Sequence, residues 1–210
     1  MRSDMKKLLC GSLALVCAGL FAAEKTDEIP LPTPNLKTNV SLKFALDKRR
    51  TSRTFAPHAL SELDISNLLW AAYGSNRADG KRTVPAAMGI YSISIYAALP
   101  DGVYQHLHGD NVLKKVSSED VRSFSDSRKM GAKAPVVLIM VADKEAFGEK
   151  GGKYEAIEAG AIMQNIYLYC AGNGLNTVVC GSFDGEKLAK ALKLPASKYV
   201  ILTQVVGCGR

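Results

Sequence analysis

The sequence predicts a single α+β domain. Strand-like and helix-like segments interleave along the chain without the regular alternation of a parallel α/β fold. The Asp101-Gly102 pair between two β-rich runs indicates a hairpin. The chain has 210 residues, of which 47% are hydrophobic and 22% charged, so it could form one domain or two small ones with an ordinary core.

The N-terminus has the pattern of a secretory signal peptide, expected over residues 1–23. Cations at Arg2, Lys6 and Lys7 precede an apolar run over residues 8–21, and cleavage is expected after Ala22 or Ala23. An uncleaved anchor is the alternative, but the run is shorter than the ~20 residues of a membrane span. We therefore expect an extracytoplasmic protein, periplasmic or secreted, with no stable membrane insertion after cleavage.

Beyond the leader, residues 24–39 contain three prolines amid polar residues and are expected to form an extended tether to a domain over residues 40–210. The first helix of that domain follows Ser41, because Leu42, Ala45, Leu46 and Arg49 have helical spacing. Ser61 and Asp64 form a carboxylate variant of the capping box, and Gly74 ends this second helix. Further helices are expected over residues 86–90, 117–129, 154–171 and 186–192.

Strands are predicted over residues 93–99, 103–107, 135–141, 177–180 and 200–206. The run at 135–141 is continuously apolar, which is typical of a strand buried on both faces. The helix at 154–171 is apolar around almost its whole circumference, as in a core or interface helix. A membrane span is the alternative, but Glu158, Gln164 and Asn165 in its middle would be costly in lipid.

The formal net charge of +7 favours anionic partners. The cations are scattered and no zinc-finger or RNA-binding pattern occurs, so small anions fit better than nucleic acid. His106 and His108 would share a strand face, but they have no acidic partner motif, so we expect no metal site. No nucleophile motif surrounds Cys180, and one disulfide among Cys170, Cys180 and Cys208 remains open.

Three arginines, Arg49, Arg50 and Arg53, occur within five residues at the end of a predicted helix. Guanidinium groups match phosphate oxygens bidentately, and the Thr51 and Ser52 hydroxyls add shorter hydrogen bonds. The other interpretation is that these cations only offset the negative end of the helix dipole. The cluster is the strongest candidate for a phosphate site.

Four motifs occur in order: Arg49-Arg50-Thr51-Ser52-Arg53, Pro85-Ala86-Ala87-Met88, Glu158-Ala159-Gly160 with Gln164-Asn165, and Cys180-Gly181-Ser182-Phe183. Over about residues 40–210 the chain resembles the nitroreductase family, and within it the branch of SagB-type dehydrogenases. The resemblance implies an intertwined homodimer with a central, mostly antiparallel sheet flanked by helices. It also implies that the bound phosphate belongs to FMN.

By this resemblance, Arg49, Arg50 and Thr51 hold the phosphate and ribityl chain, and Arg53 reaches the N1/O2 edge of the flavin. Pro85, Ala86, Ala87 and Met88 line the flavin from the second subunit, although Ala86 replaces the usual serine. Cys180 and Gly181 lie against the ring, and Arg210 is a second phosphate ligand. No protein residue acts as acid, base or nucleophile, because the flavin carries the chemistry.

The implied reaction is ping-pong transfer from a reductant to an acceptor such as a nitroaromatic or quinone. NAD(P)H is a candidate electron donor, although export would separate the protein from that cytoplasmic reductant. The alternative is an exported flavin-binding or scavenging protein without turnover.

Overall fold

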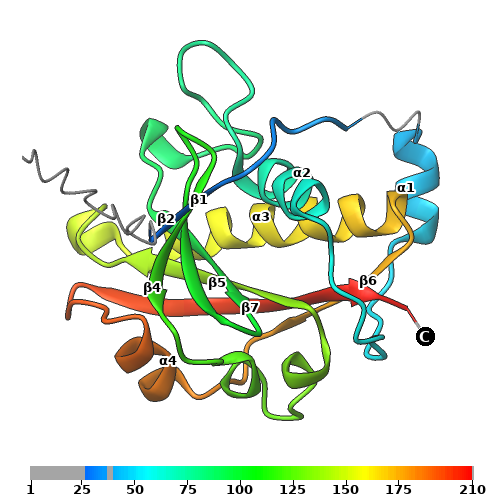
Figure 1. Cartoon of the computed structure of the whole chain (residues 1–210). Helices are drawn as coiled ribbons and strands as arrows, with labels where there is room; N and C mark the ends of the chain where they lie inside the picture. Colours follow the sequence, from blue (N-terminus) through cyan, green and yellow to red (C-terminus); the bar gives the residue numbers. More distant parts are fainter. Residues whose placement is uncertain (1–26, 37–39, 210) are drawn as a thin grey trace, which may run out of the picture.

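The computed structural model describes residues 27–36 and 40–209. The predicted signal peptide and Arg210 lie outside these residues. Within them, seven strands form one sheet in the order β1-β4-β3-β2-β5-β7-β6, and every neighbouring pair is antiparallel. Helices flank this sheet, so the predicted α+β fold is confirmed (Figure 1).

The bounds of the elements agree closely with most of the predicted segments. The strands are β1 Glu28–Pro30, β2 Ile93–Leu99, β3 Gly102–Leu107, β4 Val112–Ser117, β5 Val136–Asp143, β6 Leu175–Cys180 and β7 Lys198–Cys208. The α-helices are α1 Leu42–Lys48, α2 Glu62–Tyr73, α3 Lys153–Gly172 and α4 Gly185–Ala191, and the 3-10 turns are η1 Ala87–Gly89, η2 Arg122–Phe124, η3 Gly131–Lys133 and η4 Gly148–Lys150.

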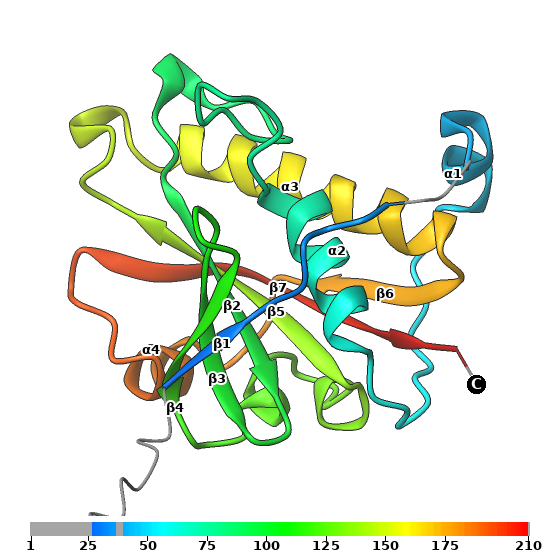
Figure 2. The same cartoon turned by 45° about the horizontal axis from the view of Figure 1, so that its top comes forward.

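The central strand β5 is covered on both faces. Leu138 and Met140 point into the core beneath α2 and α3, whereas Val137 and Ile139 point into the core on the side of α4. The two layers of helices are visible in Figures 1 and 2. Burial on both faces explains why this strand is apolar at successive positions rather than at alternate ones.

The helix boundaries follow the predicted capping residues. The Ser41 hydroxyl accepts the Phe44 N–H at the start of α1. Ser61 and Asp64 form a complete capping box at the start of α2, which ends at Gly74 as predicted. The predicted helix over residues 86–90 is only the 3-10 turn η1.

The helix predicted over residues 117–129 is wrong. The structure has strand β4 ending at Ser117, and then the short turn η2 and a loop. The buried Asp126 carboxylate accepts backbone N–H bonds from Arg128, Met130 and Gly131 at 2.8–2.9 Å. The carboxylate thus satisfies loop amides that a helix would have bonded to its own carbonyls.

The described part of the predicted tether is extended, but it packs on the domain. Strand β1 pairs with β4 at the edge of the sheet. Beyond it, the Ser66 hydroxyl donates to the Pro32 carbonyl at 2.6 Å, and the Asn35 N–H donates to Asn67 Oδ1 at 2.6 Å. In the part of the chain that the structure describes, no helix is long and apolar enough to cross a membrane.

Candidate functional site

The arginine cluster lies on the segment Arg49–Arg53, which begins at the end of α1 and then runs beside β6. The Arg49 N–H caps α1 by donating to the Ala45 carbonyl, as predicted for a residue that closes this helix. The chain then runs extended, with the Ser52 N–H donating to the Thr177 carbonyl at 2.9 Å. The side chains of Arg50, Thr51 and Arg53 are exposed and that of Arg49 is half-buried.

Tyr167 of α3 anchors this segment to the domain. Its hydroxyl oxygen lies 3.0 Å from the Thr51 hydroxyl and accepts the Val179 N–H at 3.1 Å. The Arg49 guanidinium lies over the Tyr167 ring, 5.4 Å from its centre, within the range of a cation–π contact. Tyr167 was not predicted from the sequence, because a single tyrosine on an apolar helix carries no motif.

Arg53, Cys180 and Gly181 line the same cavity. The cavity has a volume of about 210 Å³, and Asp126, Arg128 and Met130 form its opposite wall. Arg128 adds a second guanidinium that the sequence analysis did not find, because it lies in the segment assigned to a helix. The volume is below the ~300–1,000 Å³ that is typical of a ligand pocket.

Cys180 is not a nucleophile in this environment. Its side chain is buried, and burial together with the Asp126 carboxylate raises the pKa of the thiol to about 11. The thiol is therefore protonated at neutral pH, whereas a reactive cysteine needs the thiolate. Cys170, Cys180 and Cys208 are all free, so the disulfide left open by the sequence does not form.

Arg50 does not face the cavity of Arg53. Together with Lys48 and Ser52, it lines a neighbouring cavity of about 250 Å³ beside the C-terminal end of α3. Because side chains alternate along an extended segment, consecutive arginines point to different sides. A shared phosphate role for Arg49 and Arg50 therefore stays a prediction, and Arg210 lies outside the described residues.

The segment Pro85–Met88 lies on a different side of α3 from the arginine cluster. Asn165 of α3 donates to the Thr83 carbonyl at 3.3 Å, whereas Tyr167 contacts Thr51. Two residues along a helix correspond to a rotation of about 200°, so the two segments lie on opposite sides of α3. Figures 1 and 2 show α1 at the C-terminal end of α3 and the chain that enters β2 nearer its N-terminal half. One chain does not bring both groups of predicted residues together.

His106 and His108 have different surroundings. His106 is buried on β3, and burial lowers its pKa to about 4, so it is neutral at neutral pH. His108 Nε2 lies 2.6 Å from a guanidinium nitrogen of Arg82. This ring nitrogen therefore faces a positive charge rather than a site for a metal ion. No group of three or more His, Cys, Asp or Glu side chains that could hold a metal ion occurs in the described residues.

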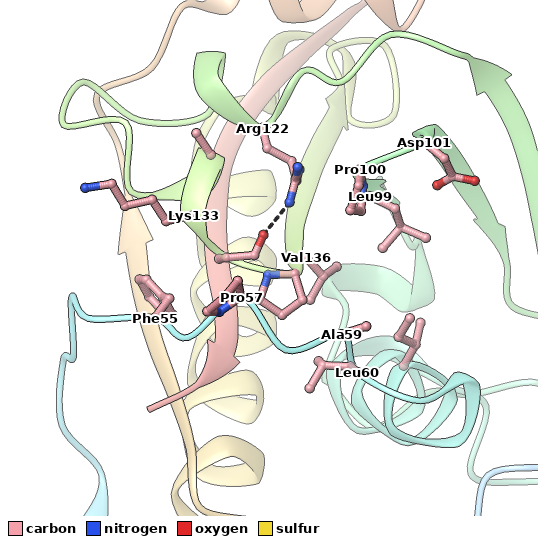
Figure 3. A pocket seen from close by; sticks show the side chains of 14 residues that line it. Phe55, Pro57, Ala59, Leu60, Leu99, Pro100, Asp101, Arg122, Lys133 and Val136 are labelled. Carbon is pink, nitrogen blue, oxygen red and sulfur yellow. Dashed lines mark hydrogen bonds between the residues drawn. The ribbon is translucent and has the colours of Figure 1, made fainter. Parts of the chain in front are cut away.

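A larger cavity of about 550 Å³ lies at the end of the sheet, beside the N-terminus of α2 (Figure 3). Its walls are mostly apolar, and Arg122 at its edge is already bonded to Asp120 and to the Ala134 carbonyl. None of the predicted flavin-contacting residues lines it. It is therefore separate from the arginine site.

The family model for nitroreductases matches residues 46–209, nearly the whole described domain. The chain belongs to the nitroreductase family. A protein of Methanocaldococcus jannaschii that carries the name nitroreductase is 30% identical to this chain over 195 residues. The match covers 86% of this chain and 97% of that protein. The match includes the arginine segment from Arg49, the Pro85–Met88 segment and the Cys180 turn.

Solved structures agree with the family membership. A nitroreductase-named protein from Ralstonia eutropha JMP134 superimposes with a TM-score of 0.82 at 34% identity, covering 88% of this chain and 90% of that one. A nitroreductase-named protein from Desulfovibrio desulfuricans, solved in complex with FMN, has a TM-score of 0.61 at 18% identity, covering 80% and 86%. At that identity the second similarity shows the fold alone. The protein is a nitroreductase-family oxidoreductase.

Proposed function

We propose that the protein is an FMN-dependent oxidoreductase of the SagB-type dehydrogenase-like branch. It passes electrons in a ping-pong cycle from a reductant to an acceptor such as a nitroaromatic or a quinone. The observation that carries this proposal is the cavity in which Arg53 faces the Cys180-Gly181 turn within a nitroreductase fold. The FMN complex of the Desulfovibrio desulfuricans protein, which has the same fold, supports the choice of cofactor.

The residues present fit a flavin mononucleotide. Arg49 and Thr51, both held by Tyr167, would bind the phosphate and ribityl chain, and Arg50 and Arg210 would add cations from the flanks. Gly181 leaves open space where a side chain would begin, which permits close approach of a planar ring. Bound FMN would supply the hydride-accepting ring, and no protein nucleophile is needed.

Arg53 and Arg128 give the cavity its positive charge. The neighbouring Asp126 carboxylate accepts three loop N–H groups, and among the described residues it forms no salt bridge with either guanidinium. A positive charge fixed beside the flavin stabilises the anionic reduced ring more than the neutral oxidised ring. These two arginines would therefore favour reduction.

A second chain would complete the site. On α3, Ile157 is 57% exposed, and on η1 Met88 is 67% exposed, so both apolar side chains are available for contact with a second chain. Ile157 begins a stripe with Ala161, Gln164 and Leu168 at alternating spacings of four and three residues, as in a helix that packs against another helix. A homodimer that buries this stripe would bring Pro85–Met88 of one chain to the arginines of the other.

The cellular location and the electron donor are also proposals. Residues 1–23 carry the charge and hydropathy pattern of a leader, which supports export. An exported enzyme would draw electrons from a donor other than cytoplasmic NAD(P)H, or oxidise a substrate of its own. If the leader stays uncleaved in the cytoplasm, NAD(P)H is the natural donor.

The test is a spectrum of the purified mature protein, followed by mass spectrometry of the released cofactor. We expect a yellow protein that releases FMN rather than FAD or riboflavin. Anaerobic reduction with NADH or dithionite, followed by addition of menadione or nitrofurazone, should reoxidise the flavin. A colourless protein that added FMN does not stabilise against heat would overturn the proposal. A flavin that cannot be reoxidised by any acceptor would favour the alternative, a scavenging protein.

A further inference from the structure

We propose that Asn165 and Glu158 of α3 are positioning residues for the flavin. They clamp both ends of the segment 83–92, here named the flavin arm, so that Pro85–Met88 are held ready for the FMN of the partner chain. The role in flavin binding rests on the proposed function. The clamp itself follows from contacts within one chain.

Asn165 fixes the first end of the arm. Its side-chain amide donates to the Ala71 carbonyl of α2 at 3.1 Å and to the Thr83 carbonyl at 3.3 Å. One side chain thus joins α3, α2 and the arm. The Thr83 N–H adds a bond to the Gly74 carbonyl at 2.9 Å, where α2 ends.

Glu158 fixes the second end. Its carboxylate is 2% exposed, and one oxygen accepts both the Ser92 N–H at 3.0 Å and the Ser92 hydroxyl at 2.6 Å. The other oxygen accepts the Tyr73 hydroxyl of α2. Burial and the Glu158 charge raise the pKa of Tyr73, so the tyrosine keeps the proton that it donates. Three donors compensate a carboxylate that burial would otherwise penalise.

Arg82 and Tyr91 close the base of the arm. The Arg82 N–H donates to the Tyr91 hydroxyl at 2.9 Å. The Arg82 guanidinium lies over two rings that also contact each other, 4.0 Å from the centre of Tyr73 and 4.5 Å from that of Tyr91. Arg82, just before the arm, and Tyr91, near its second end, are therefore bonded to each other. Thr83 and Ser92, the two end residues of the arm, are bonded to α3.

The middle of the arm has a backbone that such anchoring must maintain. Met88 has φ 55° and Gly89 has φ 73°, and Met88 is mostly exposed. A non-glycine residue with positive φ persists only where the surrounding structure determines it. The turn is closed by its own bonds from the Gly89 and Ile90 N–H groups to the Ala86 and Ala87 carbonyls, and the bonds that join the arm to α3 lie at its two ends.

The clamp also links the arm to the surface that would form the dimer. Asn165 and Glu158 are adjacent in the α3 sequence to Gln164 and Ile157, two members of the stripe, of which Ile157 is exposed and Gln164 half-buried. Packing of α3 against a second chain would therefore set the position of the arm relative to the partner's arginines. An arm held before binding reduces the entropy that FMN binding must pay.

The experiment compares Asn165→Ala with Asn67→Ala. Asn67 of α2 is a matched control, because it also makes two hydrogen bonds to a backbone segment, but to Asn35 rather than to the arm. Hydrogen–deuterium exchange of the apo protein is measured at Gly89 and Ile90, whose N–H groups are bonded within the arm. FMN dissociation constants are measured by the quenching of flavin fluorescence.

We expect at least tenfold faster exchange at Gly89 and Ile90 and at least tenfold weaker FMN binding in Asn165→Ala. Both quantities should stay within about twofold of the wild type in Asn67→Ala, even if both variants lower Tm. If Asn165→Ala fails to fold, Ser92→Ala takes its place. This variant removes the hydroxyl bond to Glu158 and keeps the Ser92 N–H bond. It should also speed exchange at Gly89 and Ile90 and weaken FMN binding, each to a smaller degree.

Unchanged exchange in the arm would overturn the clamp whether or not FMN binds. Faster exchange with unchanged FMN affinity would overturn its role in flavin binding. Failure of the wild type to bind FMN would instead overturn the proposed function, and with it the flavin role, while the exchange data would still decide the clamp.

Discussion

At the scale of single residues, the four arginines near the cavity have different surroundings. Arg49 is half-buried over Tyr167, Arg53 and Arg128 line the cavity beside Cys180, and Arg50 lines another cavity. Residues of one type, two of them adjacent in the chain, therefore have separable roles. We therefore propose that position in the fold, rather than the arginine-rich motif, separates the arginines that retain the cofactor from those that tune its potential.

Arg53→Gln should make the flavin harder to reduce while leaving much of it bound. Loss of a charge beside the developing anion should lower the stability of the reduced state by on the order of 1–3 kcal/mol. Arg49→Gln should mainly weaken FMN retention. Redox titration and FMN dissociation constants measure the two effects.

Arg50→Gln is the control for the redox effect, because its side chain lines the other cavity. Its midpoint potential should match the wild type. An unchanged potential in Arg53→Gln, or an equal fall in Arg50→Gln, would contradict the role given to Arg53.

At the scale of elements, the loop between η2 and η3 forms one wall of the cavity and depends on a single side chain. The Asp126 carboxylate accepts the backbone N–H groups of Arg128, Met130 and Gly131 in this loop. The prediction of a helix here failed because residue propensities do not reveal that a buried carboxylate will organise the backbone. The same misassignment hid Arg128, which became a candidate only when the loop was seen beside β6.

Asp126→Ala should lower the free energy of unfolding by about 2–3 kcal/mol, because it leaves loop amides without their acceptor. Asp184→Ala is the control, since Asp184 caps α4 through one N–H at the surface. That variant should cost only about 1 kcal/mol. Urea denaturation measures both, and equal losses would show that Asp126 does not organise the loop.

At the scale of the whole molecule, the sheet separates two helical layers, and α3 carries groups with different tasks around its circumference. Ile162 and Ile166 enter the core, Tyr167 holds the arginine segment, and Asn165 holds the flavin arm. The remaining face exposes Ile157. This division explains why the helix is apolar almost all round without being a membrane span.

Ile157→Asp should dissociate the proposed dimer and weaken FMN binding at least tenfold, because a charge would enter an apolar interface. Sedimentation velocity and FMN titration provide the measurements. Leu63→Asp, which changes a partly exposed apolar side chain on α2, should leave both unchanged. A monomeric wild type that binds FMN tightly would contradict the shared site.

The sequence by itself determined most of the local elements of this protein and its family resemblance, but not β1, β4 or the loop after β4. Ser41, Ser61 and Gly74 mark helix ends, and the apolar run of β5 marks a buried strand, because caps and periodicity act over a few residues. Only the tertiary structure decided which distant groups meet: Arg53 with Arg128, Thr51 with Tyr167, and both ends of the flavin arm with Asn165 and Glu158. These contacts depend on long-range packing around α3 and the sheet, which no local pattern in the chain encodes.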